Sequence, residues 1–208
     1  PNFNECDFSL SFDYIDNPKS LRFPLSAITL YEGGKKDGFE KNIDFDKIKS
    51  EKTKFCNFIF SNPNASLRNT LFQELSKYKK VDSGGRVLNN LGYLVDDKLK
   101  FQNEYKFTIA FENSEYPGYT TEKLVHPKLV DSIPIYWGNP VVDRDWNTKS
   151  FINAYNFKNI GELVEYIKEV DNNDDLWYKM LVEPHLNENS KDINWRNFID
   201  FFEKIITN

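Results

Sequence analysis

The stretch FENSEYPGYTTEKLVHPKLVDSIPIYWG, Phe111 to Gly138, decides the fold class. It opens like the end of a buried strand and closes like another strand, and a polar turn and an amphipathic segment lie between them. Strand, helix and strand in this order are typical of a βαβ unit, whose two strands run parallel. The stretch therefore predicts part of a parallel sheet with a polar turn at one strand end.

The neighbouring segments continue this alternation of strand-length and helix-length patterns. We therefore predict an α/β fold, with a Rossmann-like parallel sheet, helices on both faces and ligands bound at the carboxyl ends of the strands. The expected strands span residues 55–60, 80–86 with a turn, 105–113 and 133–138, and the expected helices span residues 65–78, 121–132, 159–170 and 193–208.

The beginning of the chain has a different pattern. Residues 6–15 alternate apolar and polar positions as a strand does, and a short helix is expected near Pro24. The segment Gly33 to Lys54 has three glycines, many lysines and few apolar residues. This composition predicts a linker that ends near Lys54.

The composition excludes several classes of protein. A hydrophobic content of 39% and a net charge of -5 are typical of a globular protein, and no Lys/Arg block is long enough to bind nucleic acid. No apolar run is long enough for a transmembrane segment, and no secretory leader opens the chain, although Pro1 in place of Met leaves room for a segment upstream. Cys6 and Cys56 are expected to be buried free thiols, which fits a reducing compartment.

An anion site is expected after the first strand of the predicted sheet. The turn Ser61 to Ala65 places free backbone amides at the start of a helix, and Arg68 follows in its first turns. The Arg68 guanidinium can grip a diphosphate with two parallel hydrogen bonds. A solvated helix arginine is the alternative interpretation.

A second set of polar residues follows the strand that ends at Phe111. Thr121 is a suitable N-cap, so Glu122 and Lys123 are expected in the first turn of a helix. The helix dipole favours the carboxylate there but disfavours a lysine unless an anion lies alongside, and an ordinary surface Glu–Lys pair is the alternative. Pro127 removes a helical hydrogen bond, so we expect this helix to be kinked or to start later.

These motifs resemble a known family. FENSEYPGYTTEKL…IPIYWG, with FIFSNPNASLR and VDSGGRVLNNLG before it and KSFINAYNF after it, is similar to the donor-binding half of the α1,3/α1,4-fucosyltransferases of glycosyltransferase family 10, bacterial type. The resemblance implies a GT-B fold, in which two Rossmann-like domains face each other across a cleft. It divides the chain into residues 1–50, a remnant of the N-terminal acceptor domain with its linker, residues 51–193, a GDP-fucose-binding domain, and residues 194–208, a C-terminal helix.

The resemblance also implies roles for individual residues. Arg68 and Lys123 match the residues that bind the diphosphate and stabilise the leaving group, and Glu122 matches the residue that binds the ribose. Arg86 matches a family motif to which we assign no role. The implied donor-binding residues are Ser61, Asn62, Arg68, Asn113, Tyr119, Glu122 and Lys123.

The implied reaction is inverting transfer of L-fucose from GDP-fucose to a hydroxyl of an N-acetylglucosamine or glucose unit of a glycan, as in Lewis-type or lipopolysaccharide fucosylation. The resemblance implies no metal or other cofactor, a cytoplasmic enzyme that can also lie at the periphery of the inner membrane, and a general base upstream of Pro1. Glu5 is the nearest carboxylate within the chain, but it lies beyond the family's position. The chain as given is therefore expected to bind the donor and barely to catalyse.

Two alternatives remain at this point. The chain can be a nucleotide-sugar-binding module without catalysis, or a GT-B transferase that uses GDP-mannose or a UDP-sugar. The Asp-x-Asp pairs at residues 44–46 and 143–145 match a metal-binding pattern of other glycosyltransferases, but each match has only three residues. His126 and His185 have no partner motif, so we expect exposed or structural roles for them.

Overall fold

The computed structural model describes residues 5–32, 43–187, 190 and 195–207. Its strands are β1 (Ser9–Ser11), β2 (Ser20–Arg22), β3 (Lys54–Phe58), β4 (Val81–Ser83), β5 (Tyr105–Phe111), β6 (Ile133–Trp137) and β7 (Ile152–Asn153). Its α-helices are α1 (Leu25–Glu32), α2 (Phe45–Glu51), α3 (Ser66–Ser76), α4 (Lys98–Gln102), α5 (Glu122–Leu129), α6 (Ile160–Asp171), α7 (Asp174–Val182) and α8 (Trp195–Thr207). Short 3-10 helices are η1 (Val142–Arg144), η2 (Thr148–Ser150) and η3 (Ala154–Asn156).

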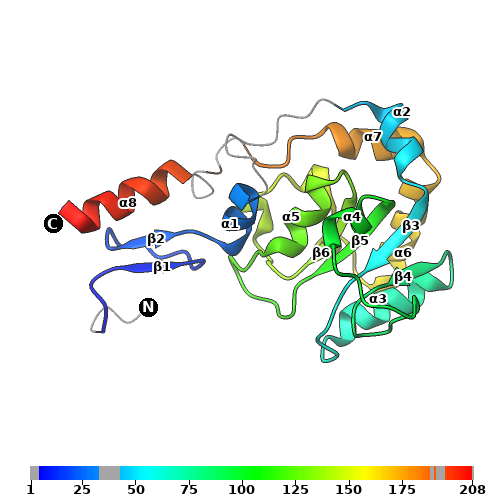
Figure 1. Ribbon diagram of the computed structural model, residues 1–208, viewed down its shortest axis with the longest axis horizontal. Helices are drawn as coiled ribbons and strands as arrows, with labels where there is room; N and C mark the ends of the chain where they lie inside the picture. The colour runs from blue at the N-terminus through cyan, green and yellow to red at the C-terminus, as the bar shows by residue number, and fades with distance from the viewer. Residues whose placement is uncertain (1–4, 33–42, 188–189, 191–194, 208) are drawn as a thin grey trace.

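A five-stranded parallel sheet forms the centre of the molecule (Figure 1). The strand order is β4-β3-β5-β6-β7, so the chain runs outward from β3 to β4 and then returns to the other side of β3 with β5. In open α/β sheets a ligand crevice lies outside the carboxyl ends of the strands where the order reverses in this way. The topology therefore places a crevice at the ends of β3 and β5.

The two faces of the sheet carry separate apolar clusters, because side chains alternate between faces along each strand. One cluster contains Ile109 and Ile135 and packs against α3, α6 and α7. The other contains the next residues along the same strands, Ala110 and Tyr136, and packs against α1 and α5. Strand β5 is buried along its whole length. The predicted parallel sheet with helices on both faces is therefore observed.

The terminal elements lie together on one side of the sheet (Figure 1). Strands β1 and β2 form a separate two-stranded parallel sheet, and β1 is much shorter than the strand predicted over residues 6–15. Helix α8 packs beside them, with the ring centroids of Phe198 and Phe23 4.8 Å apart and those of Phe201 and Phe8 6.0 Å apart. The helices expected near Pro24 and at the end of the chain are both present.

The predicted linker is wrong over residues 45–54, because this segment forms α2 and the start of β3, while residues 33–42 lie outside the described residues. Asp44 caps α2 by accepting a hydrogen bond from the Lys47 amide. Ile48 is buried in the core, and the Phe45 ring lies 5.1 Å from that of Trp177 in α7. The sequence prediction also missed helices α4 and α7.

Helix α5 begins at Glu122, where the capping pattern first placed it, and runs through Pro127 to Leu129. Of the two outcomes that we expected from Pro127, a kink or a later start, the later start is wrong. The proline lies in the last turn of this short helix, so the backbone hydrogen bond that its ring excludes is one near the helix end.

Gly85 provides a test of the packing behind the sheet edge. A Cβ at Gly85 would lie 2.2 Å from the carbonyl oxygen of Phe60 and 2.3 Å from the backbone nitrogen of Phe60. These backbone atoms cannot move away by a change of side-chain rotamer. We expect Gly85→Ala to lower the free energy of unfolding by about 1–3 kcal/mol, the usual cost of overpacking. The control is Gly161→Ala, whose Cβ meets only the Asn159 side chain at 3.0 Å. Equal urea midpoints for the two variants would contradict this account.

Candidate functional site

The predicted site residues gather at the carboxyl ends of β3 and β5. Helix α3 starts eight residues after β3, at Ser66, and α5 starts at Glu122 after the loop that follows β5. Arg68 therefore comes from the first turn of one helix and Lys123 from the first turn of the other. Both lie where the strand order of the sheet reverses.

Arg68 is buried, with 1% of its surface exposed, so the alternative of a solvated helix arginine is wrong. Its guanidinium donates hydrogen bonds to the Asn62 carbonyl at 2.8 Å and to Oδ1 of Asn113 at 3.1 Å. It also lies over the Phe60 ring, 3.7 Å from the ring centroid. The side chain is thus held in one orientation by neutral groups.

Burial lowers the pKa of Arg68 to about 10, although the nearby Glu112 carboxylate opposes this shift. The guanidinium therefore remains charged at neutral pH. Within the part of the chain that the structure describes, Arg68 forms no ion pair and its Nε has no hydrogen-bond partner. A buried cation with only neutral partners favours the binding of an anion.

Lys123 is the second cation of the site. Thr121 caps α5 as predicted, with its Oγ1 accepting a hydrogen bond from the Lys123 amide at 3.3 Å. The Lys123 Nζ lies 3.3 Å from Oε2 of Glu112 and 3.2 Å from Oε1 of Glu122. Burial alone would lower the pKa of Lys123, but these two carboxylates outweigh it and raise the pKa. The expected Glu–Lys pair exists, but the lysine side chain is only 18% exposed and a second carboxylate joins it.

Glu112 is a residue for which the sequence analysis assigned no role. Its fully buried carboxylate accepts hydrogen bonds from the Thr121 amide at 2.8 Å and from the Thr121 hydroxyl, in addition to its ion pair with Lys123. Gly138 makes room for this side chain, because a Cβ there would lie 2.4 Å from Cβ and Cγ of Glu112. Glu112 thus joins the end of β5 to the start of α5. A carboxylate directly after the apolar run Ile109 to Phe111 was the available signal.

The other predicted donor-binding residues lie around these two cations. Ser61 and Asn62 are exposed on the loop between β3 and α3, and only the backbone carbonyl of Asn62 contacts Arg68. Tyr119 is half-buried, and burial, together with the charge of Glu112, raises its pKa. Asn113 is exposed apart from its hydrogen bond to Arg68.

Two hollows are lined by residues of the site. The first, about 150 Å³, is lined by Arg68, Glu112 and Trp137 among others. The second, about 40 Å³, is lined by Phe60, Lys123 and by residues that include Glu122 and His126. Phe60, which lines the second hollow, contacts Arg68 in the first. Glu112, which lines the first hollow, forms an ion pair with Lys123 in the second. Trp137, which the sequence analysis did not select, adds an aromatic wall beside Arg68.

The weaker motifs have other partners. Asp145 forms an ion pair with Arg22 at 2.7 Å, and Asp44 caps α2, so neither Asp-x-Asp pair has both carboxylates free. The buried His185 lies 3.3 Å from the Lys128 Nζ. Both cysteines are free thiols, but only Cys56 is buried, and Cys6 is half-buried. Among the described residues, no three His, Cys, Asp or Glu side chains are grouped to hold a metal ion. In the same ranges, no helix is both long and apolar enough to cross a membrane.

Comparison with known proteins identifies the class. The family model for glycosyltransferase family 10 (fucosyltransferase), C-terminal part, matches residues 49–183. The chain therefore belongs to glycosyltransferase family 10, as its motifs indicated.

Particular relatives agree with this assignment. The chain is 33% identical to the alpha-(1,3)-fucosyltransferase FucT of Helicobacter pylori over 243 positions, which cover 100% of this chain and 51% of the relative. It is 34% identical to the GDP-fucose protein O-fucosyltransferase 3 of Xenopus laevis, over 67% of this chain and 35% of the relative. The chain thus spans about half the length, or less, of these curated relatives.

The fold agrees as well. A crystal structure of an α1,3-fucosyltransferase with GDP-fucose superimposes with a TM-score of 0.86 and 32% identity, covering 100% of this chain and 72% of that one. A crystal structure of an α1,3-fucosyltransferase with GDP gives a TM-score of 0.85. The predicted α/β fold of GT-B type is confirmed.

Glu112 generates a test that uses pH. Burial raises the pKa of Glu112 above its ordinary value of 4.5, although Lys123 and Thr121 oppose the shift. A group whose folded pKa is raised costs stability when it ionises, so its contribution should fall as pH rises through the interval between 4.5 and the raised value. Glu112→Gln removes this ionisation. The free energy of unfolding of the variant, relative to that of the wild type, should therefore increase as pH rises above 4.5.

Chemical denaturation at a series of pH values measures this difference. The control is Glu165→Gln, because Glu165 is 72% exposed on α6 and its difference from the wild type should stay nearly constant. If the difference in unfolding free energy between Glu112→Gln and the wild type does not change with pH, ionisation of Glu112 does not cost stability and the prediction is wrong.

Proposed function

We propose that this chain carries the donor site of a fucosyltransferase and binds GDP-fucose across the ends of β3 and β5. The observation that carries the proposal is the buried Arg68, a cation without a carboxylate partner in the described structure, at the N-terminus of one helix, with Lys123 at the N-terminus of the next. Two cations and two helix N-termini are suited to a diphosphate. The proposed ribose contact is Glu122, and Ser61, Asn62, Asn113 and Tyr119 complete the site.

We further propose transfer with inversion at the anomeric carbon. The acceptor hydroxyl attacks this carbon as its bond to the diphosphate oxygen breaks, and that oxygen keeps the bonding electrons. Arg68 and Lys123 stabilise the charge that develops there, and a general base takes the hydroxyl proton. We propose that the base lies upstream of Pro1, in an acceptor domain. The greater length of the relatives supports such a domain.

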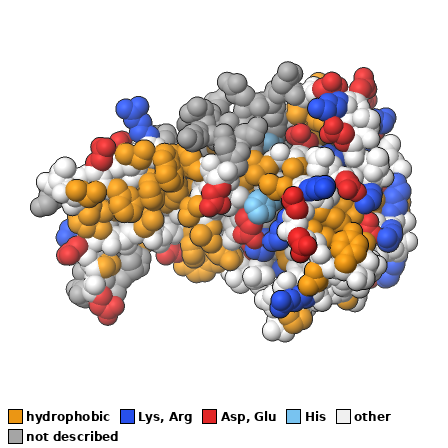
Figure 2. Space-filling view, viewed as in Figure 1, with side chains coloured by type: hydrophobic (Ala, Val, Ile, Leu, Met, Phe, Trp, Pro, Cys, Tyr) orange, Lys and Arg blue, Asp and Glu red, His pale blue; other side chains and the backbone are white. Residues whose placement is uncertain are grey.

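The size of the site and an apolar surface support such a second domain. A hollow of about 150 Å³ is smaller than the roughly 300–1,000 Å³ of common ligand pockets, so another wall is needed. Figure 2 shows a band of hydrophobic side chains over α8, whose exposed apolar residues include Ile199, Phe202 and Ile206, the last 81% exposed, and Leu10 in the neighbouring β1 is exposed as well. We propose that the acceptor domain packs against this face.

The acceptor and the linkage are the finer part of the proposal. An oligosaccharide with an N-acetylglucosamine or glucose hydroxyl, linked α1,3 or α1,4, is our leading acceptor, and the Helicobacter pylori relative is named for the α1,3 linkage. The protein O-fucosyltransferase relatives favour a protein acceptor as the second candidate. We propose a cytoplasmic enzyme, or one at the periphery of the inner membrane.

Calorimetry with GDP, UDP and GDP-fucose tests the donor. We expect this chain to bind GDP and GDP-fucose and not UDP. UDP selectivity would indicate a transferase with another donor, and binding of a free glycan without nucleotide would indicate a lectin-like module.

The two cations are tested by Arg68→Ala and Lys123→Ala. Each should weaken GDP binding and lower turnover of the full-length enzyme by roughly 100- to 1000-fold, the usual effect of losing one group that stabilises developing charge. Lys158→Ala is the control, since Lys158 is an exposed lysine before α6. Thermal melts identify any variant that fails to fold, and wild-type kinetics in both folded variants would refute the assignment.

Metal dependence is tested separately. Because two cations already face the proposed diphosphate, EDTA should leave transfer by the full-length enzyme unchanged. A strict requirement for Mn²⁺ or Mg²⁺ would contradict this proposal and direct attention to Asp143, since Asp145 is paired with Arg22.

A further inference from the structure

The segment Phe12–Tyr14, directly after β1, lies against the loop between β5 and α5 that carries Tyr119. The Phe12 ring centroid lies 5.4 Å from that of Tyr119 and 5.6 Å from that of Tyr116. The next residue, Asp13, accepts a hydrogen bond from the Tyr116 hydroxyl at 2.9 Å. Two consecutive residues near the start of the chain thus contact both tyrosines of the loop.

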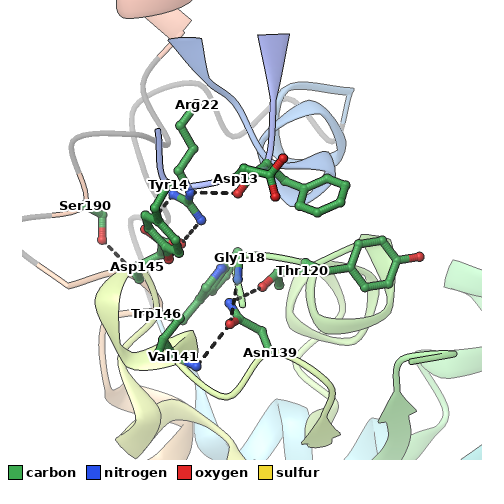
Figure 3. A network of polar contacts seen from close by, with 12 residues as sticks. Asp13, Tyr14, Arg22, Gly118, Thr120, Asn139, Val141, Asp145, Trp146 and Ser190 are labelled. Carbon is green, nitrogen blue, oxygen red and sulfur yellow. Dashed lines mark hydrogen bonds and ion pairs between the residues drawn. The ribbon is translucent and has the colours of Figure 1, made fainter. Parts of the chain in front are cut away.

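A buried ion pair holds this segment in place (Figure 3). The Arg22 guanidinium donates to both oxygens of Asp145, at 3.0 and 2.7 Å, and the two side chains are 6% and 4% exposed. The Nε of Arg22 donates to the Phe12 carbonyl at 3.1 Å. The Tyr14 ring lies between the guanidinium groups of Arg22 and Arg144, at 4.0 and 3.8 Å from its centroid. The backbone that presents Phe12 is therefore fixed to the segment after β6.

The loop is held from the opposite side as well (Figure 3). Asn139 accepts a hydrogen bond from the Gly118 amide at 2.9 Å and donates one to Oγ1 of Thr120 at 3.0 Å. Gly118 has a φ of +86°, and a Cβ there would lie 2.4 Å from the Phe12 carbonyl oxygen. The loop thus passes between Asn139 and Phe12 with no space for a further side-chain atom at Gly118.

We propose that Phe12 is a positioning residue of the donor site, which acts through Tyr119. This inference rests on the proposed function, because Tyr119 is one of the proposed donor contacts. Phe12 restricts the ring of Tyr119 and the loop that leads into Thr121 and Lys123. The loop therefore loses less conformational entropy when the donor binds. The Arg22–Asp145 ion pair acts one step further back, by fixing the backbone of Phe12.

The test compares Phe12→Ala with Phe8→Ala in the full-length protein. Both variants remove a phenyl ring from the start of the chain, but Phe8 packs on Phe201 in α8, with centroids 6.0 Å apart, and is not placed against the loop. We expect Phe12→Ala to weaken GDP binding by about 3- to 10-fold, the effect of losing one aromatic contact, and Phe8→Ala to leave it unchanged. Phe12→Tyr, which keeps the ring, should restore the affinity.

Two further measurements separate positioning from general stability. In a Tyr119→Ala background, Phe12→Ala should weaken binding by less than about 2-fold, because the side chain through which it acts is absent. Hydrogen exchange without ligand should show faster exchange at the amides of Tyr119 and Thr120 in Phe12→Ala than in Phe8→Ala, since both amides hydrogen-bond within the loop.

The outcomes distinguish this inference from the proposed function. If the wild type does not bind GDP, the proposed function fails, while the exchange measurement still tests whether Phe12 orders the loop. If the wild type binds GDP and Phe12→Ala binds it equally well, the inference is wrong. Equal loop exchange in the two variants, or an undiminished effect of Phe12→Ala in the Tyr119→Ala background, would also overturn it.

Discussion

The buried carboxylate of Glu112 is the interaction on which the site depends. A carboxylate without compensation is costly at full burial, and here the Thr121 amide and hydroxyl and the Lys123 ammonium offset part of that cost. All three come from the start of α5, so Glu112, the first residue after β5, fixes the helix that follows the loop. The absence of a Cβ at Gly138 leaves the space that this arrangement needs.

Arg68 and Lys123 reach the same edge of the sheet with different surroundings. Arg68 is held by an aromatic ring, a side-chain amide and backbone carbonyls, so its charge is not neutralised by any carboxylate among the described residues. Lys123 is shared between two carboxylates. An anion entering the site would therefore meet one cation that is already available and one that must exchange partners.

The elements that depend on local pattern were predicted well from the sequence, and those that depend on distant contacts were not. Thr121 and the apolar spacing after it located the start of α5, and the alternation of strands and helices gave the sheet. Helix α2 was missed because its apolar residues are few and find their partner in Trp177, more than a hundred residues later. The burial of Arg68 and the role of Glu112 were missed for the same reason, since both follow from how β3 and β5 meet. The effect of Pro127 was overestimated because its place in the last turn was not known.

The distance along the chain between Arg22 and Asp145, 123 residues, has a consequence for folding. Forming a contact between residues so far apart in the chain costs the entropy of closing a large loop. The contact therefore forms late unless the intervening structure has already brought the two residues together. Strands β3 to β6 lie between the two residues and are parallel neighbours in the sheet. The sheet therefore has to assemble first, and on a ribosome the segment around Phe12 must wait for most of the chain to be synthesised before it can dock.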